Sequence, residues 1–517
     1  MGGEEIMLRK INLSRAAAFF KNVISEKNLN ILRSFFMSKW YPIWVAFSVL
    51  IGRVTCLEVY FAMLDFILVS VALLVCDSIR PVLPNLITFL YRIPLEHSPG
   101  APLYSTYYSE TKLGAFWVLA AVFFVALALF YIKNKVFVGV NILKTPLFIS
   151  LSLFSLSFLT AGMFSGNKMK EDWGFALLEI FVFFIVYLIL YYGLRRENAD
   201  ELIGYFTYIC AMCVIVLSLE VLDVFLRVEG AMSGGVINKD YVNFGWGISN
   251  TCGSALSVLA PICVLGAMRS KRFCAPYYAV ATLAVVATYF TLARASVLVG
   301  TIGFVLCMII SCCAGKNKKG CRISAIVVVL LTALVLIVFK DWLSQTFVHY
   351  SNRGFSDSGR RNIWEYFLNA FKEAPIFGNG FFYFTYGLKL SAFTPALAHN
   401  TFVQLLASMG VFGFAAYVFY RVCTFFPFLK HFTIEKFMLM ISGGFLVFES
   451  LIDNFIFWFN PTFVYNICIL LAIMHCEQAG AKKEEISDTS DTPNIGESSD
   501  IIDANTENLS LTSEIKK

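Results

Sequence analysis

Residues 341–400 carry most of the side chains in this sequence that could take part in chemistry. They form the longest polar interval between two apolar stretches, contain the Arg360-Arg361 pair and end in His399-Asn400. A neutral imidazole accepts a proton near neutral pH, and a guanidinium group binds phosphate through paired N–H donors. These residue types indicate proton transfer beside an anion-binding site. From spacing alone, anchoring at a membrane interface is an alternative role for the arginines, and contact with lipid headgroups is one for the histidine.

Arg294 is a second candidate of the same chemical kind. It lies within the apolar segment Tyr289–Gly300, at the end of one span or the start of the next, with no carboxylate nearby in sequence. An ionisable side chain at membrane depth is costly unless it serves a cavity or a partner. An arginine at the outer face of a membrane suits a bidentate contact with phosphate or pyrophosphate.

The composition predicts an all-α integral membrane protein that positions these residues. Hydrophobic residues make up 58% of the chain and charged residues 15%, which is too little polar surface for a soluble globular protein. The basic residues lie in loops beside apolar stretches and are not interleaved with aromatic residues, so we expect no nucleic-acid partner.

The apolar stretches recur at membrane-spanning length. We expect 12 to 14 transmembrane helices, the uncertainty lying in residues 40–93, where charged residues interrupt the pattern. The expected spans are 40–57, 58–77, 81–93, 113–132, 145–165, 173–194, 202–227, 249–268, 275–293, 295–313, 322–340, 400–422, 436–453 and 460–475. Lys and Arg concentrate in alternate loops, which by the positive-inside rule places both termini in the cytoplasm. The same rule places residues 93–112, 228–248 and 341–400 outside.

Four regions follow from this pattern. Residues 1–39 are a basic cytoplasmic segment, 40–244 the N-terminal transmembrane helices, and 245–475 the region with the chemical candidates. Residues 476–517 are acidic and poor in aromatic residues, so we expect a disordered cytoplasmic tail. The fourteen cysteines follow no metal-ligand spacing, and we expect no structural disulfide.

Within the external loop, the sequence predicts one amphipathic helix. It begins at Gly359 or Arg360 and ends before Pro375, because the residue before a proline is pushed out of the α region. Its apolar positions have helical spacing and Trp364 flanks them, so the helix should lie along the outer interface or roof a cavity. Further along, Gly378-Asn379-Gly380 is a turn with permissive backbone and a weak signal for a phosphate cradle. Gly410 and Gly413 favour close helix packing.

Taken in order, these segments resemble the signature of the O-antigen ligase/polymerase superfamily. The matching pieces are Leu292–Ser296 around Arg294, Arg360 with Trp364, Pro375–Gly380, His399-Asn400 with Gln404, Gly410 and Gly413, and Asn250 at the start of a span. The resemblance covers roughly residues 245–475. Ala293 and Ala295 depart from the usual Ser and Gly beside the arginine, and Ser408 stands where a Glu is frequent.

The resemblance implies a polytopic glycosyltransferase with a GT-C-like fold. It implies metal-independent transfer, with inversion, from an undecaprenyl-diphosphate-linked glycan, and no cofactor. His399 would be the general base, Arg294 and Arg360 would bind the diphosphate, and Arg361 is the second choice for that role. The supporting residues would be Asn250, Trp364, Gly378, Gly380, Asn400 and Gln404. Membrane lipid and a chain-length regulator protein are the expected partners, in the bacterial cytoplasmic membrane.

Several functions fit this reading. We favour a polymerase that extends a surface polysaccharide on its carrier, with a ligase that transfers the glycan to a lipid or protein acceptor as the alternative. A polysaccharide flippase or other transporter would favour internal repeats and charges near the bilayer midplane, and the sequence shows neither. A sensor that signals through the acidic tail is supported by the tail alone.

Overall fold

The computed structural model describes residues 26–92, 110–137, 140–233, 236–341, 344, 360–384, 397–457 and 459–490. Residues Met1–Cys476 form one compact unit and Glu477–Lys517 form another. Much of the basic N-terminal segment, about half of the expected external loop at 341–400 and the end of the acidic tail lie outside the described residues. The described part of the tail continues α20 to Ser490.

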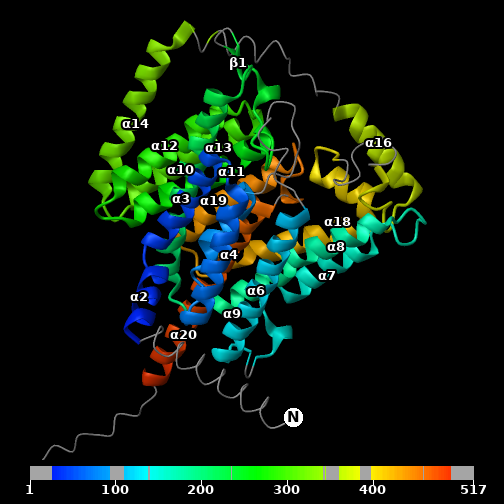
Figure 1. Cartoon of the computed structure of the whole chain (residues 1–517), viewed down its shortest axis with the longest axis horizontal. Helices are drawn as coiled ribbons and strands as arrows, with labels where there is room; N and C mark the ends of the chain where they lie inside the picture. Colours follow the sequence, from blue (N-terminus) through cyan, green and yellow to red (C-terminus); the bar gives the residue numbers. More distant parts are fainter. Residues whose placement is uncertain are drawn as a thin grey trace, which may run out of the picture. The chain divides into compact units, whose positions relative to one another are not determined.

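The described chain is helical almost throughout, which confirms the predicted all-α class (Figure 1). The helices are α2 Glu26–Met37, α3 Trp40–Thr55, α4 Glu58–Val75, α5 Val82–Thr88, α6 Glu110–Lys133, α7 Phe148–Thr160, α8 Lys170–Ile180, α9 Val186–Leu194, α10 Ala199–Arg227, α11 Ser249–Arg269, α12 Cys274–Phe290, α13 Arg294–Ala314, α14 Lys318–Val338, α16 Arg360–Glu373, α18 Thr401–Leu429, α19 Ile434–Glu449 and α20 Phe459–Ser490. The short elements are η1 Phe89–Arg92, η2 Ile142–Lys144, η3 Phe181–Ile185, η4 Lys239–Tyr241 and η5 Phe455–Phe457. The strands β1 Met232–Ser233 and β2 Val236–Ile237 pair antiparallel in a small hairpin before η4.

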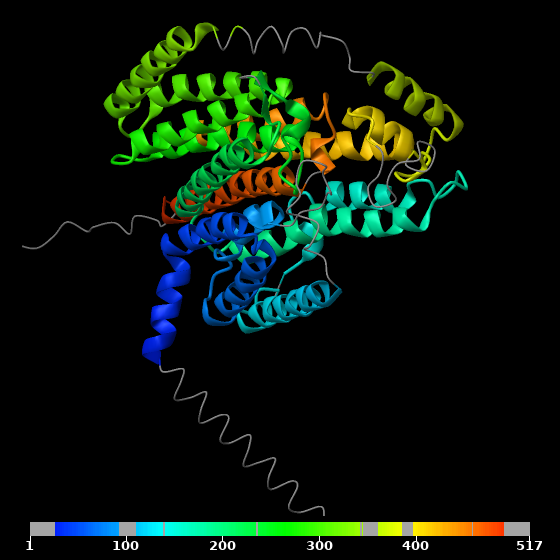
Figure 2. The same ribbon diagram turned by 45° about the horizontal axis from the view of Figure 1, so that its top comes forward.

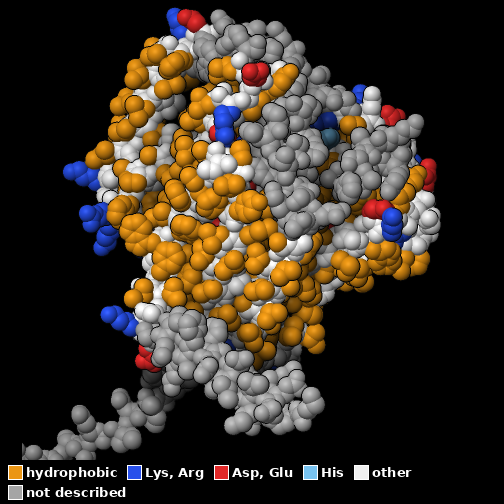
Figure 3. Space-filling view, viewed as in Figure 1, with side chains coloured by type: hydrophobic (Ala, Val, Ile, Leu, Met, Phe, Trp, Pro, Cys, Tyr) orange, Lys and Arg blue, Asp and Glu red, His pale blue; other side chains and the backbone are white. Residues whose placement is uncertain are grey.

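Nine helices among the described residues are long and apolar enough to cross a membrane. The bent pair α2 and α3 would add a tenth span, so the described residues hold fewer spans than the 12 to 14 expected, and α7 and α12 are shorter apolar helices of 13 and 17 residues. Residues 81–93 do not form the expected span, because α5 is only 7 residues long and crossing the hydrocarbon core takes about 20. Apolar side chains cover much of the face in Figure 3, with Lys and Arg toward its edges.

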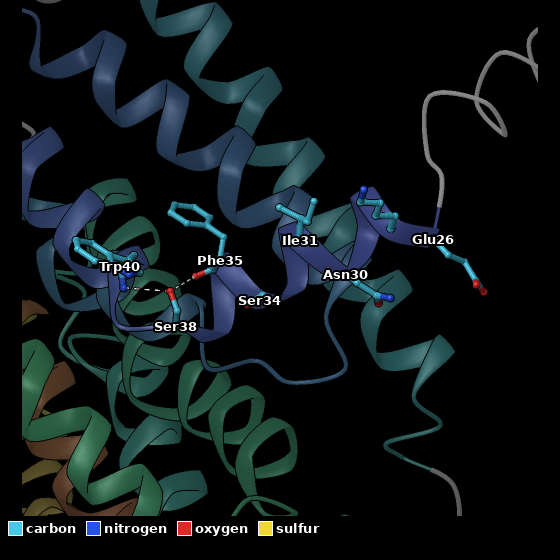
Figure 4. A pocket seen from close by; sticks show the side chains of 8 residues that line it. Glu26, Asn30, Ile31, Ser34, Phe35, Ser38 and Trp40 are labelled. Carbon is cyan, nitrogen blue, oxygen red and sulfur yellow. Dashed lines mark hydrogen bonds between the residues drawn. The ribbon is translucent and has the colours of Figure 1, made fainter.

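The bend between α2 and α3 has a local cause. The two axes differ by 69°, and the Ser38 hydroxyl lies at the corner between them. It donates to the Phe35 carbonyl at 2.7 Å and accepts from the Trp40 backbone N–H at 3.1 Å. Figure 4 shows this corner beside a pocket lined by residues of the two helices. None of the expected site residues lines that pocket.

α11 is the central helix of the part of the fold that holds the site. The whole stretch of α11 that is long enough to cross a membrane is buried, although the helix is rich in Ser, Gly and Ala. Small residues let neighbouring helices approach closely, and α11 packs against α10, α12, α13 and α19. At its first turn, a Cβ on Gly253 would lie 2.7 Å from the Cβ of Ala293. The start of α11 is therefore pressed against the start of α13.

Two groups of buried charges connect the N-terminal helices. Asp65 of α4 accepts hydrogen bonds from Trp44, Ser48 and Arg92, and the side chains of Asp65 and Arg92 are each 3% exposed. Arg53 of α3 pairs with Asp223 of α10 at 3.0 Å and lies 3.7 Å from Glu220. A buried charge is tolerated when it is paired and hydrogen-bonded, and these groups hold α3, α4 and α10 together.

Candidate functional site

α16 packs against the start of α18 and has the bounds that the sequence predicts. It runs from Arg360 to Glu373 and buries Phe367 and Ala370. These two side chains pack with Ala398 and Ala407, which flank the start of α18. The Trp364 indole N–H donates to the Ala398 carbonyl at 2.8 Å. α16 therefore anchors the backbone directly before His399, and Figures 1 and 2 both show it beside α18.

Asn400 fixes the backbone after His399. Its side-chain oxygen caps α18 by accepting from the N–H groups of Phe402 and Val403. Its amide nitrogen donates to the Leu451 carbonyl at 2.9 Å, and the Thr401 N–H donates to the Ser450 carbonyl at 2.8 Å. The residue Asn400 thus joins the start of α18 to the segment after α19.

Asp453 is the partner of His399. Its Oδ1 lies 3.1 Å from the His399 Nδ1, with side-chain exposures of 7% for Asp453 and 36% for His399. Burial raises the pKa of Asp453, but the bond and charge of His399, the Asn454 N–H and the charge of Arg360 together hold that pKa below its ordinary value. Asp453 is therefore ionised at neutral pH. As an acceptor of the Nδ1–H it leaves the Nε2 of His399 able to take a proton.

Gln404 connects the segment that holds His399, before α18, to the segment that holds Asp453, after α19. Its side chain is fully buried. The Oε1 accepts from the Ala398 N–H at 2.8 Å and from the Asn454 side-chain amide at 2.9 Å, while the Nε2 donates to Ser408. One amide thereby sets the separation of the residues beside His399 and Asp453.

Asn250 supports the same carboxylate from α11. Its Nδ2 donates to the Oδ2 of Asp453 at 3.2 Å, and its Oδ1 accepts from the Lys239 ammonium at 2.7 Å. The two charges fix the orientation of the amide, since its oxygen faces a cation and its nitrogen faces an anion. Lys239, Asn250, Asp453 and His399 form a continuous chain of polar contacts.

The arginines that the sequence singled out lie at the starts of α16 and α13. Arg360 is the first residue of α16, is half-buried, and acts electrostatically on Asp453. Arg294 is the first residue of α13 and is exposed, next to the turn that packs on Gly253 of α11. Arg361 is also exposed. The site therefore combines a histidine–carboxylate pair with the half-buried Arg360, whose charge acts on the carboxylate.

Gly378 and Gly380 serve the packing of α18. α18 is kinked at Gly410, which has φ 68° and ψ −167°. The Asn379 and Gly380 N–H groups donate to the carbonyls of Ala407 and Ser408, whose helical donors the kink removes. The Gly378 N–H donates to Ala374, and a Cβ on Gly378 would lie 2.3 Å from the Ser408 carbonyl carbon. The three N–H groups of this turn are thus bonded within the protein and do not cradle a phosphate.

Sequence reasoning missed Asp453 and Lys239. Asp453 ends an expected apolar span, and an acidic residue at the edge of a span was the signal that could have identified it. Lys239 lies in a short polar loop without any motif. The structure brings together His399, Asn400, Gln404, Asn250, Trp364 and Arg360, with Arg294 at the start of the helix packed on α11. Among the residues that the structure describes, no three His, Cys, Asp or Glu side chains form a metal-binding group.

Comparison with known proteins identifies part of the chain. Residues 278–418 match the family model described as O-antigen ligase. The matched region contains Arg294, Arg360 and His399, whereas Asn250 and Asp453 lie outside it. No curated protein matches the chain in sequence. The resemblance to the O-antigen ligase/polymerase superfamily is confirmed for this region.

Proposed function

From the premise that residues 278–418 are an O-antigen ligase-family domain in a multi-pass membrane protein, we propose that the chain is an inverting glycosyltransferase. Its donor is a glycan linked to a polyprenyl diphosphate such as undecaprenyl diphosphate. Its product is a longer surface polysaccharide, made at the outer face of the cytoplasmic membrane. The observation that carries the proposal is the His399–Asp453 pair with Arg360 beside it.

The reaction begins with proton transfer to His399. A sugar hydroxyl of the acceptor donates its proton to the Nε2 while its oxygen attacks the anomeric carbon of the donor glycan. Asp453 holds the imidazole through Nδ1 and stabilises the imidazolium that forms, as the acid of a catalytic triad does. The new glycosidic bond forms as the bond from the anomeric carbon to the diphosphate oxygen breaks.

The leaving diphosphate keeps the electron pair of the broken bond. Arg294 and Arg360 bind it and stabilise its developing charge, since preorganised cations act most strongly where charge appears in the transition state. Arg361, which follows Arg360 on α16, is the second choice for binding the diphosphate. The transfer needs no metal ion in this scheme, because the arginines supply the positive charge.

Polymerase activity is the first choice and ligation to a lipid or protein acceptor the second. In both, the donor is the same and the acceptor differs. In the polymerase the acceptor is a second lipid-linked glycan, and a chain-length regulator is the expected protein partner. Both termini and the basic loops would then face the cytoplasm, as the positive-inside pattern predicts.

The test is transfer by the purified full-length protein in detergent with undecaprenyl-diphosphate oligosaccharide and EDTA. We expect a ladder of longer lipid-linked products. Product only after addition of a lipid-core or protein acceptor would make the protein a ligase. No transfer to any acceptor, together with movement of the carrier across liposomes, would contradict the proposal and indicate a transporter.

A further inference from the structure

Arg421 is a permanently charged side chain buried away from the His399 site. It lies on the part of α18 that follows the Gly410 kink and is 7% exposed. A guanidinium group keeps its proton in proteins, so it cannot become neutral as a buried carboxyl or amine can. Among the described residues no carboxylate forms an ion pair with it, and the polar groups within its reach are the neutral hydroxyls of Tyr417 and Tyr465. A buried cation without an anion is strongly unfavourable.

Three tyrosine rings surround this guanidinium. Its central carbon lies 5.0 Å from the ring centre of Tyr417, 5.3 Å from that of Tyr420 and 4.5 Å from that of Tyr465. Phe154 of α7 stacks on Tyr420 with ring centres 5.6 Å apart. Cation–π contacts stabilise the charge, but the rings and their hydroxyls are neutral and do not cancel it. The three tyrosine rings explain why the Arg421 side chain stays in place, but they do not explain how its charge is balanced.

The polar atoms around the guanidinium carry no negative charge. Among the described residues, the buried Asn466 side-chain nitrogen has no hydrogen-bond partner. Tyr420 already donates to the Asn466 oxygen, and the Tyr465 hydroxyl bonds Thr424. The hydroxyls of Tyr417 and Tyr465 lie within hydrogen-bonding reach of the guanidinium, but both are neutral. The cluster therefore holds a buried positive charge that none of these side chains neutralises.

Lys436 shows how the fold treats another buried cation. Its side chain is also fully buried, but its ammonium donates to the carbonyls of Pro427 and Lys430 near the end of α18 and contacts the Cys476 sulfur. Cations at a helix C-terminus are favourable because the last carbonyls carry partial negative charge. The chain supplies backbone carbonyls to Lys436, whereas around Arg421 it supplies neutral aromatic rings and hydroxyls.

We propose that Arg421, Tyr417 and Asn466 bind a small inorganic anion, with chloride as the occupant. The anion accepts hydrogen bonds from the guanidinium, the Tyr417 hydroxyl and the Asn466 amide, and it cancels the charge of Arg421. It holds α18 to α20, since Asn466 and Tyr465 lie on α20. This site is separate from the diphosphate site and does not depend on the proposed transfer reaction.

The first test is thermal unfolding of the full-length purified protein in sodium chloride and in sodium gluconate at equal ionic strength. A ligand that binds only the folded state raises Tm with its concentration. We expect Tm to rise with chloride and then level off, by roughly a few degrees, and bromide to act like chloride. The same Tm in chloride and gluconate at every concentration would overturn the proposal.

The second test assigns the effect to the cluster. Arg421→Met should abolish the dependence of Tm on chloride, whereas the control Arg269→Met should keep it, because Arg269 pairs with Glu435 and Asp200. If Arg421→Met does not accumulate, Asn466→Leu should move the response to higher chloride concentration. An unchanged chloride response in the cluster variants would overturn the assignment. A rise in Tm with added anionic phospholipid and not with chloride would show that a lipid phosphate is the anion instead.

Discussion

The N-terminal helices and the His399 site both hold charged side chains in low-dielectric surroundings, and they use them differently. Asp65 and Arg92 are each 3% exposed, and Asp65 is surrounded by donors from three other residues. At the His399 site the carboxylate Asp453 is buried, but His399 is 36% exposed and Arg360 is half-buried. The Asp65 group is closed to solvent, whereas the His399 site is open to solvent on one side.

The difference indicates different roles. A closed group satisfies its own charges and therefore fixes the helices that contribute to it. An open group leaves donors and a proton acceptor at an accessible edge, where an anionic substrate can complete it. We therefore expect mutations in the Asp65 group to lower stability and mutations in the His399 group to lower the rate of transfer.

Asp453→Asn should have one of the largest effects on rate. The variant keeps the size of the side chain but removes the charge that stabilises the imidazolium, so transfer should fall by about 10²- to 10⁴-fold. The measurement is turnover of lipid-linked donor by purified protein, with the yield of folded protein as control. Wild-type turnover in this variant would show that the pair is structural, like the Asp65 group.

Arg92→Met should show the opposite behaviour. Removing one partner of a buried ion pair leaves the other charge uncompensated and costs about 3–5 kcal/mol. We expect a large loss of Tm and of folded protein in the membrane, with the molecules that do fold keeping their turnover. If the variant were as stable as the wild type but inactive, the N-terminal group would belong to the site.

Arg294→Lys should have an intermediate effect. The charge remains but the fork of parallel N–H donors is lost, and one charge-assisted hydrogen bond corresponds to about a 10- to 100-fold change. Transfer rates over a range of donor concentrations would measure it, with the exposed Lys372→Arg on α16 as a control. Unimpaired transfer by Arg294→Lys would argue against a bidentate contact with the diphosphate.

The smallest effect concerns pH. Because the pKa of Asp453 lies below its ordinary value, its ionised form contributes stability that is present above the pKa of the unfolded carboxyl, about 3.9. That contribution is lost as pH falls through the lower folded pKa. The difference in Tm between the wild type and Asp453→Asn should therefore shrink as pH falls below about 4. A difference that is as large at pH 3 as at pH 5 would contradict the pairing.

Short sequence patterns predicted the helix bounds and caps, because these depend on residues that are close together in the chain. α16 follows from helical spacing that ends at Pro375, and Asn400 is an N-cap residue directly before an apolar run. The all-α class follows from composition. The expected span at 81–93 was wrong because apolar character alone does not reveal that Pro84 and Asn85 lie in a helix of 7 residues.

Contacts between distant residues could not be predicted in the same way. Asp453 contacts His399, which is 54 residues away in the sequence, and Asn250, which is 203 residues away. No periodicity in the sequence indicates such contacts. The Gly378–Gly380 turn was recognisable by its permissive residues, but its partner, the kink at Gly410, depends on how α18 packs. The candidate site residues were named through family resemblance, and their structural partners could be identified only in the structure.

The most direct test of the central claim compares His399→Ala with the wild type and with His431→Ala, a histidine in the turn between α18 and α19. Each protein is purified, checked for an unchanged Tm, and assayed for transfer from undecaprenyl-diphosphate oligosaccharide at several pH values. The account predicts that His399→Ala loses transfer by about 10²-fold or more at every pH while His431→Ala retains it. A folded His399→Ala variant that transfers at the wild-type rate would contradict the account.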